Sequence, residues 1–119
     1  MSSIAYPLTD PAAARPLVDQ ALQANKFTVN WTDEWNAEAE VGSKAMVLLA
    51  GGFKPHILLQ LALSSGPEGA WLHVHQATTG AAGGALGMSK TKKAWQATTE
   101  DIAAGLRRAN LLTGEPQES

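Results

Sequence analysis

The sequence predicts an α+β fold, a two-layer sandwich in which helices at both ends of the chain cover one face of a four-stranded antiparallel sheet. Three observations predict it. Apolar residues recur at helical spacing near both ends, two pairs of segments between them alternate apolar and polar residues, and a short turn-forming segment joins each pair. The expected order is helix, hairpin, short connector, hairpin and long helix.

The length and composition indicate one globular domain spanning residues 1–119. The chain is 45% hydrophobic and 17% charged, which is typical of a folded protein. Its 119 residues are too few to form two stable hydrophobic cores. The absence of cysteine excludes a disulfide framework, a thiolate nucleophile and a cysteine-rich zinc site. We expect residues 1–9 and 113–119 to be frayed. Without a signal-peptide pattern or a long apolar run, we expect a cytoplasmic protein.

The first helix is expected to start at Asp10-Pro11, because Asp caps helices and Pro is tolerated at the first helical position. Pro16 is unfavourable inside a helix because it lacks an N–H donor and clashes with the preceding turn, so the helix either bends there or begins near it. Asn25 is the expected left-handed stop. The apolar face of this helix consists of Leu17, Val18, Ala21 and Leu22.

Two hairpins follow. Residues 27–31 and 35–41 alternate around a turn at 32–34, and residues 56–64 and 70–76 alternate around the turn Gly66–Gly69. Between the hairpins, residues 44–51 are either a short helix or a buried strand. Residues 78–88 are expected to form a glycine-rich loop, and Ser89 can cap the last helix. Thr98-Thr99-Glu100-Asp101 resembles a capping box, which leaves open a second helix start.

The charge is unevenly distributed along the chain. Residues 1–43 hold two basic and six acidic side chains, whereas residues 44–108 hold seven basic and three acidic ones. A dipolar surface of this kind can steer an anionic partner. A pI of about 5.8 with only three clustered lysines argues against nucleic-acid binding.

A pair of histidines on the last predicted strand raises the question of a metal site. The turn at Gly66–Gly69 predicts that Leu63 pairs with Leu72 and Leu61 with Val74, which places His73 opposite Ala62 and His75 opposite Gln60. The third histidine, His56, would then lie about 14 Å from Gln60 at about 3.4 Å per residue. We therefore predict no metal site and treat the histidines as polar residues of the open sheet face.

The glycine-rich segment resembles a P-loop without being one. Gly84, Lys90 and Thr91 match the spacing GxxxxGK[ST], but Ser89 replaces the glycine before the lysine, and no parallel strand leads directly into the loop. A general anion or nucleotide site remains a hypothesis, because backbone amides and a helix start attract anions. Its candidate residues are Gly83, Gly84, Gly87, Ser89, Lys90 and Lys92.

Three segments are similar to those of small uncharacterised bacterial α+β proteins. They read GSKAMVLL (42–49), TGAAGGALG (79–87) and KTKK (90–93), and the similarity covers residues 10–112. This resemblance implies a fold and carries over no activity, cofactor or site residue.

The leading functional hypothesis is a non-enzymatic binding module. No nucleophile, base and orienter stand at a recognisable spacing, and no cofactor motif is present. Trp71 is expected on the sheet face away from the helices, where an apolar patch is typical of a partner surface. We expect self-association or binding of another protein there, and rank contact of residues 45–53 or the glycine loop with a membrane last. The interaction face is predicted to consist of Leu58, Gln60, Ala62, Trp71 and His73.

Overall fold

The computed structural model describes residues 3–41, 57–67, 69–77 and 84–118, and for residues 84–91 it gives the helical backbone only. These residues form an α+β fold. The strands are β1 (Ser3–Leu8), β2 (Thr28–Trp31), β3 (Asn36–Val41), β4 (Ile57–Gly66), β5 (Gly69–Gln76) and β6 (Gln117–Glu118). The helices are α1 (Pro11–Ala24) and α3 (Gly84–Arg108).

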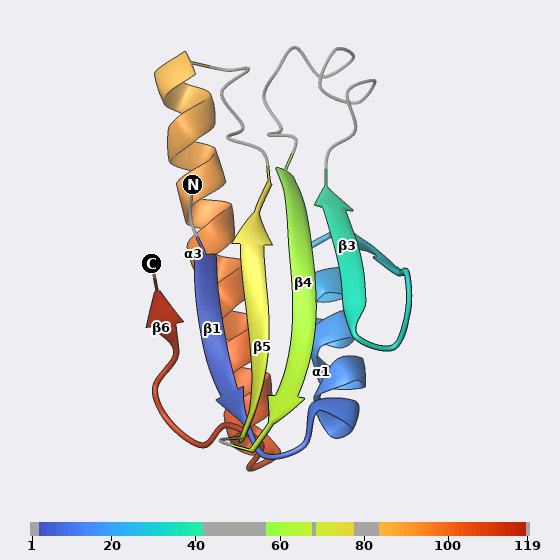
Figure 1. Ribbon diagram of the computed structural model, residues 1–119. Coiled ribbons are helices and arrows are strands. Elements are labelled where there is room, and N and C mark those ends of the chain that lie inside the picture. Colours follow the sequence, from blue (N-terminus) through green and yellow to red (C-terminus); the bar gives the residue numbers. More distant parts are fainter. Residues whose placement is uncertain (1–2, 42–56, 68, 78–83, 119) are drawn as a thin grey trace.

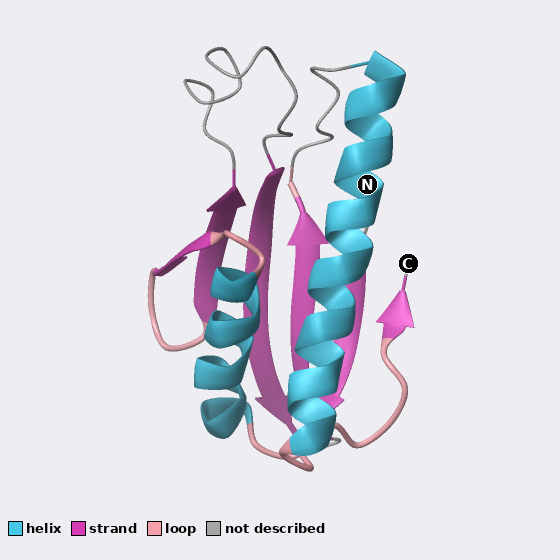
Figure 2. Cartoon of the chain, turned by 180° about the vertical axis from the view of Figure 1, so that it is seen from behind, coloured by secondary structure: helices cyan, strands magenta, loops and turns pink. Residues whose placement is uncertain are grey.

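The predicted two-layer arrangement is confirmed. Both helices lie behind the sheet in Figure 1 and in front of it in Figure 2, which shows the molecule from the other side. No described element covers the opposite face of the sheet. The apolar core therefore lies between the helices and one face of the sheet. Of the described helices, neither is long and apolar enough to span a membrane.

The sheet is larger than predicted, with six antiparallel strands in the order β2-β3-β4-β5-β1-β6 instead of four. The element order also differs, because a strand precedes the first helix. The two additional strands come from the segments that were expected to be frayed, residues 1–9 and 113–119. The chain passes from β1, near one edge, through α1 to β2 at the other edge.

Strand β1 is a buried structural element because its side chains alternate. Ile4, Tyr6 and Leu8 are buried, and all six residues of the strand pair with β5. Pro7 cannot donate a hydrogen bond, but its carbonyl accepts one from the N–H of Thr113 at 3.0 Å. The prediction of a frayed N-terminus was wrong, because the burial of Ile4, Tyr6 and Leu8 and the pairing with β5 hold residues 3–8 in the sheet.

Helix α1 begins as predicted, and the left-handed residue that follows it comes one position later than predicted. The Asp10 carboxylate accepts hydrogen bonds from the N–H groups of Ala12 and Ala13 at 3.1 and 3.3 Å. The helix runs from Pro11 through Pro16 without a new start. The left-handed residue at its end is Lys26, with φ of 71°, whereas Asn25 has φ of −97°.

Both predicted hairpins are present, and the register predicted for the second one is confirmed. Leu63 pairs with Leu72, Leu61 with Val74, Ala62 with His73 and Gln60 with His75. The turn between β4 and β5 is closed by Gly66 and Gly69, and Gly69 has φ of +123°. The other hairpin, β2 and β3, pairs with β4 through β3.

Helix α3 is one long helix. It begins at Gly84, so the last part of the predicted loop, 84–88, is helical, and the second helix start near Thr98 does not exist. Thr98 and Thr99 are buried inside the helix, and the Thr99 hydroxyl donates to the Trp95 carbonyl at 2.9 Å instead of capping. The predictions for the connector 44–51, His56 and Gly83 lie outside the described residues.

Candidate functional site

The open face of the sheet is the strongest candidate for a functional surface. Alternation along the strands places the buried side chains under the helices and the others on the open face. The five predicted residues all lie on this face, with Leu58, Ala62 and Trp71 half-buried and Gln60 and His73 exposed. The residues of β3, β4 and β5 on this face are Asn36, Glu38, Glu40, Leu58, Gln60, Ala62, Ser64, Trp71, His73 and His75.

Trp71 and His73 are in contact on this face. Their ring centroids lie 6.3 Å apart with an interplanar angle of 24°, so the rings are stacked. Trp71 lies between Pro7 of β1 and Ser64 of β4 in the sheet register. A stacked, half-buried tryptophan presents a large apolar surface whose orientation is already set.

Two rows of side chains cross the three central strands. The first is Glu38, Gln60 and His75, and the second is Asn36, Ala62 and His73. Neighbouring strands lie about 4.8 Å apart, so the Cα atoms of Glu38 and His75 are separated by roughly 10 Å.

A hollow of about 350 Å³ is lined by residues of both rows. Its lining combines a carboxylate, amides and imidazoles over an apolar floor. The lining residues are Thr32, Asn36, Ala37, Glu38, Gln60, Leu61, Ala62, His73 and His75. Among the described residues, no three acidic or histidine side chains stand close enough together to hold a metal ion. The arrangement suits binding of a surface with hydrogen-bonding groups.

Glu38, His75 and Asn36 were not among the predicted interaction residues. The place of Glu38 and Asn36 on this surface follows from the pairing of β3 with β4, which the sequence did not specify because the connector 42–56 separates the two strands. The position of His75 opposite Gln60 was predicted, but His75 was not included in the interaction face. The alternation of residues 35–41 indicated only that Glu38 and Glu40 face water. The register between β3 of the first hairpin and β4 of the second was needed to place Glu38 and Asn36 next to Gln60 and Ala62.

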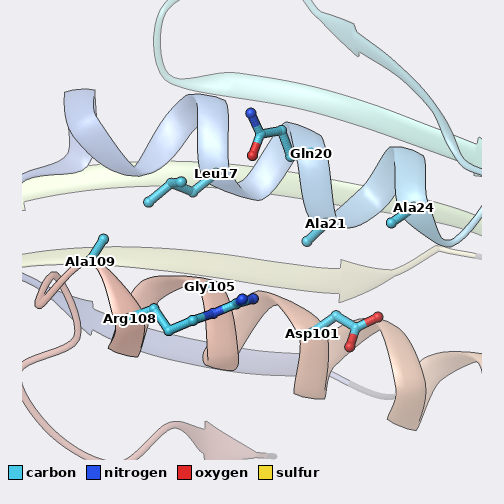
Figure 3. A pocket seen from close by; sticks show the side chains of 8 residues that line it. All are labelled: Leu17, Gln20, Ala21, Ala24, Asp101, Gly105, Arg108 and Ala109. Atoms are coloured by element: carbon cyan, nitrogen blue, oxygen red, sulfur yellow. The ribbon is translucent and has the colours of Figure 1, made fainter.

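A second hollow, of about 480 Å³, lies between the two helices (Figure 3). It exists because Ala21, Ala24, Gly105 and Ala109 are small. Ala21 points toward α3, whereas Gln20 points away from it (Figure 3).

The polar groups at this hollow are engaged with the protein itself. The Asp101 carboxylate accepts a hydrogen bond from the Asn25 side chain at 2.9 Å, and Nε of Arg108 donates to the Ala104 carbonyl at 3.4 Å. The first of these bonds joins the end of α1 to α3, and the second lies within α3.

Among the described residues, the two groups with clearly shifted pKa values, Asp33 and Tyr6, lie outside the open-face hollow. Hydrogen bonds from the N–H of Trp35 and from Asn36 lower the pKa of Asp33 in the turn between β2 and β3. Burial, and secondarily the charge of Glu118, raises the pKa of Tyr6 well above its usual value of 10.0. Both groups stabilise local structure, since each is held by hydrogen bonds within the protein.

The residues of the predicted anion site are placed on α3. Gly84, Gly87, Ser89 and Lys90 belong to its first turns, and the Lys92 side chain is exposed. The helix start at Gly84 leaves the amides of residues 84–86 without a partner inside the helix. The lysines lie farther along the helix.

No known protein family matches this chain, and no curated protein does. The resemblance to small bacterial α+β proteins therefore stays a prediction. The open face and its geometry are the basis for a functional proposal.

Proposed function

We propose that this protein is a non-enzymatic binding module that associates with a second copy of itself through the open sheet face. The observation that carries the proposal is the Trp71–His73 stack, on a face that no described element covers. The surface around the stack includes Leu58, Gln60 and Ala62. Half-buried apolar groups surrounded by polar ones are typical of the centre and rim of a protein interface.

Self-association fits the physical character of this face. Leu58, Ala62 and Trp71 are apolar groups that would leave water when a second sheet packs on them. Sheets pack face to face at about 10 Å when the side chains interdigitate. Because the Trp71 ring is already stacked, binding would restrict it little further.

The proposal is tested by measuring mass against concentration, by size-exclusion chromatography with light scattering. The wild-type protein should shift from monomer to dimer as concentration rises. Trp71→Ser should weaken dimerisation by roughly 30-fold, because a central tryptophan often contributes at least about 2 kcal/mol. Gln96→Ser is the control, since Gln96 is exposed on α3, in the helix layer on the other side of the sheet.

Two outcomes would overturn the proposal. A wild-type protein that stays monomeric at the highest concentration contradicts self-association. Equal loss of dimer in both serine variants contradicts the assignment of the interface to the open face. Circular dichroism on each variant shows whether the fold is retained.

An anion site at the start of α3 is a second candidate function. It is supported by the helix start at Gly84, which directs free backbone amides to one end of a long helix. Inorganic phosphate should raise the melting temperature, Lys90→Ala should reduce that shift, and Lys26→Ala should leave it unchanged. A melting temperature that does not respond to phosphate counts against this site.

A further inference from the structure

The open face is divided by charge across its central strand. Glu38 and Glu40 lie on β3, and His73 and His75 lie on β5. Between them, β4 presents uncharged side chains to this face, including Gln60 and Ala62. One side of β4 is therefore acidic, and the other becomes basic when the imidazoles are protonated.

The sheet register makes this division symmetrical about β4. Glu38 pairs with Gln60 on one side, and His75 pairs with the same Gln60 on the other. Glu38 and His75 therefore stand at the same height along the strands and at equal distances from β4. A rotation of 180° about an axis parallel to β4 and above Gln60 generates a second sheet over the first. It brings Glu38 of the second copy over His75 of the first, and His75 of the second copy over Glu38 of the first.

We infer that two copies of this chain pack open face to open face about a two-fold axis parallel to β4, so that Glu38 of each copy faces His75 of the other. This inference rests on the proposed self-association and adds its geometry. The symmetry produces the Glu38–His75 contact twice. Gln60 and Ala62 would meet their own counterparts at the axis.

The alternative two-fold axis, running across the strands, is disfavoured by charge. It would place β3 over β3 and β5 over β5, so that acidic groups face acidic groups and imidazoles face imidazoles. Like charges brought together in an interface oppose binding. Both axes keep the strands of the two sheets nearly aligned, which is a common packing arrangement, so the charge pattern decides between them.

This geometry makes association depend on pH. Next to His75 in the register are Gln60 on β4 and Ser3 on β1, and next to His73 are Ala62 and Ala5. None of these four neighbours is charged, and Trp71 on the same strand is uncharged too. Within the same copy, Glu38 stands two strands away and lines the same hollow as His73 and His75. In the dimer the Glu38 carboxylate of the second copy is added directly opposite His75, whereas His73 faces the uncharged Asn36. The added carboxylate favours the protonated form of His75, so dimerisation takes up protons and strengthens as pH falls.

The dimer should therefore be roughly 3- to 10-fold tighter at about pH 5.5 than at about pH 8, as two partly exposed ion pairs imply. His75→Gln should remove most of the dependence while retaining the apolar contacts. A dimer with the same affinity across this range contradicts the inferred contact.

A charge exchange tests the geometry directly. Glu38→Lys alone and His75→Glu alone should each weaken dimerisation, because each creates two like-charge contacts per dimer at about pH 6. An equimolar mixture of the two variants should form a heterodimer, since lysine then faces glutamate and glutamate faces histidine. The double variant Glu38→Lys/His75→Glu should dimerise with itself. Both charged positions are exposed, and circular dichroism verifies the fold of each variant.

The outcomes separate this inference from the function on which it rests. If the wild type dimerises and Trp71→Ser disrupts the dimer, but neither charge variant weakens it, the interface stands and the axis is wrong. If Glu38→Gln strengthens the dimer, glutamates face one another and the other axis applies. A monomeric wild type removes the proposed self-association and, with it, this geometry.

Discussion

Tyr6 shows how one buried side chain connects the two layers. It has no exposed surface, and its hydroxyl donates a hydrogen bond of 2.8 Å to the carbonyl of Thr99 in α3. That carbonyl belongs to a helix turn in which the Thr99 hydroxyl is itself bonded to Trp95. The strand that begins the described chain is therefore linked by a buried polar contact to the last helix.

We expect Tyr6 to control the alkaline stability of the protein. Burial raises the pKa of Tyr6 in the folded state above 10.0, so the unfolded state loses its proton first as pH rises. The stability that Tyr6 contributes is present below about pH 10 and declines above it. Tyr6 is the only tyrosine in the chain, so absorbance near 295 nm reports on this group alone.

Tyrosinate absorbance and loss of circular dichroism should therefore appear together above about pH 10. Tyr6→Phe should remove this alkaline transition and cost about 1 kcal/mol at neutral pH, because one buried hydrogen bond is lost. Ionisation of Tyr6 in a protein that remains folded at pH 10 would contradict this explanation.

At the scale of the element, both helices end in the same backbone motif. After α1, the N–H of Lys26 donates to Gln23 and that of Phe27 to Leu22, both at 3.0 Å. After α3, the N–H of Asn110 donates to Arg107 and that of Leu111 to Leu106. This motif requires a left-handed residue, and the two positions are Lys26 with φ of 71° and Asn110 with φ of 58°.

Lys26→Gly should stabilise the protein by about 0.5–1 kcal/mol. A residue with a Cβ atom in the left-handed region costs roughly 1–2 kcal/mol, and part of the gain is offset by the greater freedom of glycine in the unfolded chain. Lys26→Ala should give no gain, since alanine keeps the strain. Asn110→Gly should gain less, because asparagine tolerates this conformation. Urea unfolding measures all three.

Gly105→Ala should also stabilise the protein, by about 0.5–1 kcal/mol, through helix propensity. A Cβ atom at Gly105 has no atom within 4 Å, so the hollow between α1 and α3 accommodates it. Gly69→Ala is the contrasting variant, because φ of +123° makes any side chain there unfavourable. A loss of stability in Gly105→Ala would mean that the helices cannot accept even one methyl group.

The elements that were predictable are those whose information is local. Alternation and the Gly66–Gly69 turn were enough for the pairing of β4 with β5, including His75 opposite Gln60. The pairing of β3 with β4 and of β1 with β5 joins segments distant in sequence, and their register is set by tertiary packing. For that reason the sequence predicted half of the interaction face and missed Glu38 opposite Gln60.

At the scale of the whole molecule, the sheet depends on β1. It lies between β5 and β6, and its inward side chains Ile4, Tyr6 and Leu8 belong to the same core as both helices. Without β1, strand β5 would become an edge of the sheet, and one side of the core would be exposed to water. The short strand β6 has a different role, because its two residues are exposed.

Deleting residues 1–9 should therefore unfold the protein or leave it marginally stable. Full burial of each large apolar side chain contributes about 1.5–3 kcal/mol, so three of them approach the total stability of a small domain. Deleting residues 116–119 is the matched control, which removes β6 and should reduce the melting temperature by only a few degrees. Thermal unfolding followed by circular dichroism compares the two. A cooperative transition near the wild-type temperature after removal of residues 1–9 would show that β1 is dispensable, and the four-stranded sheet first predicted would then be the independently stable unit.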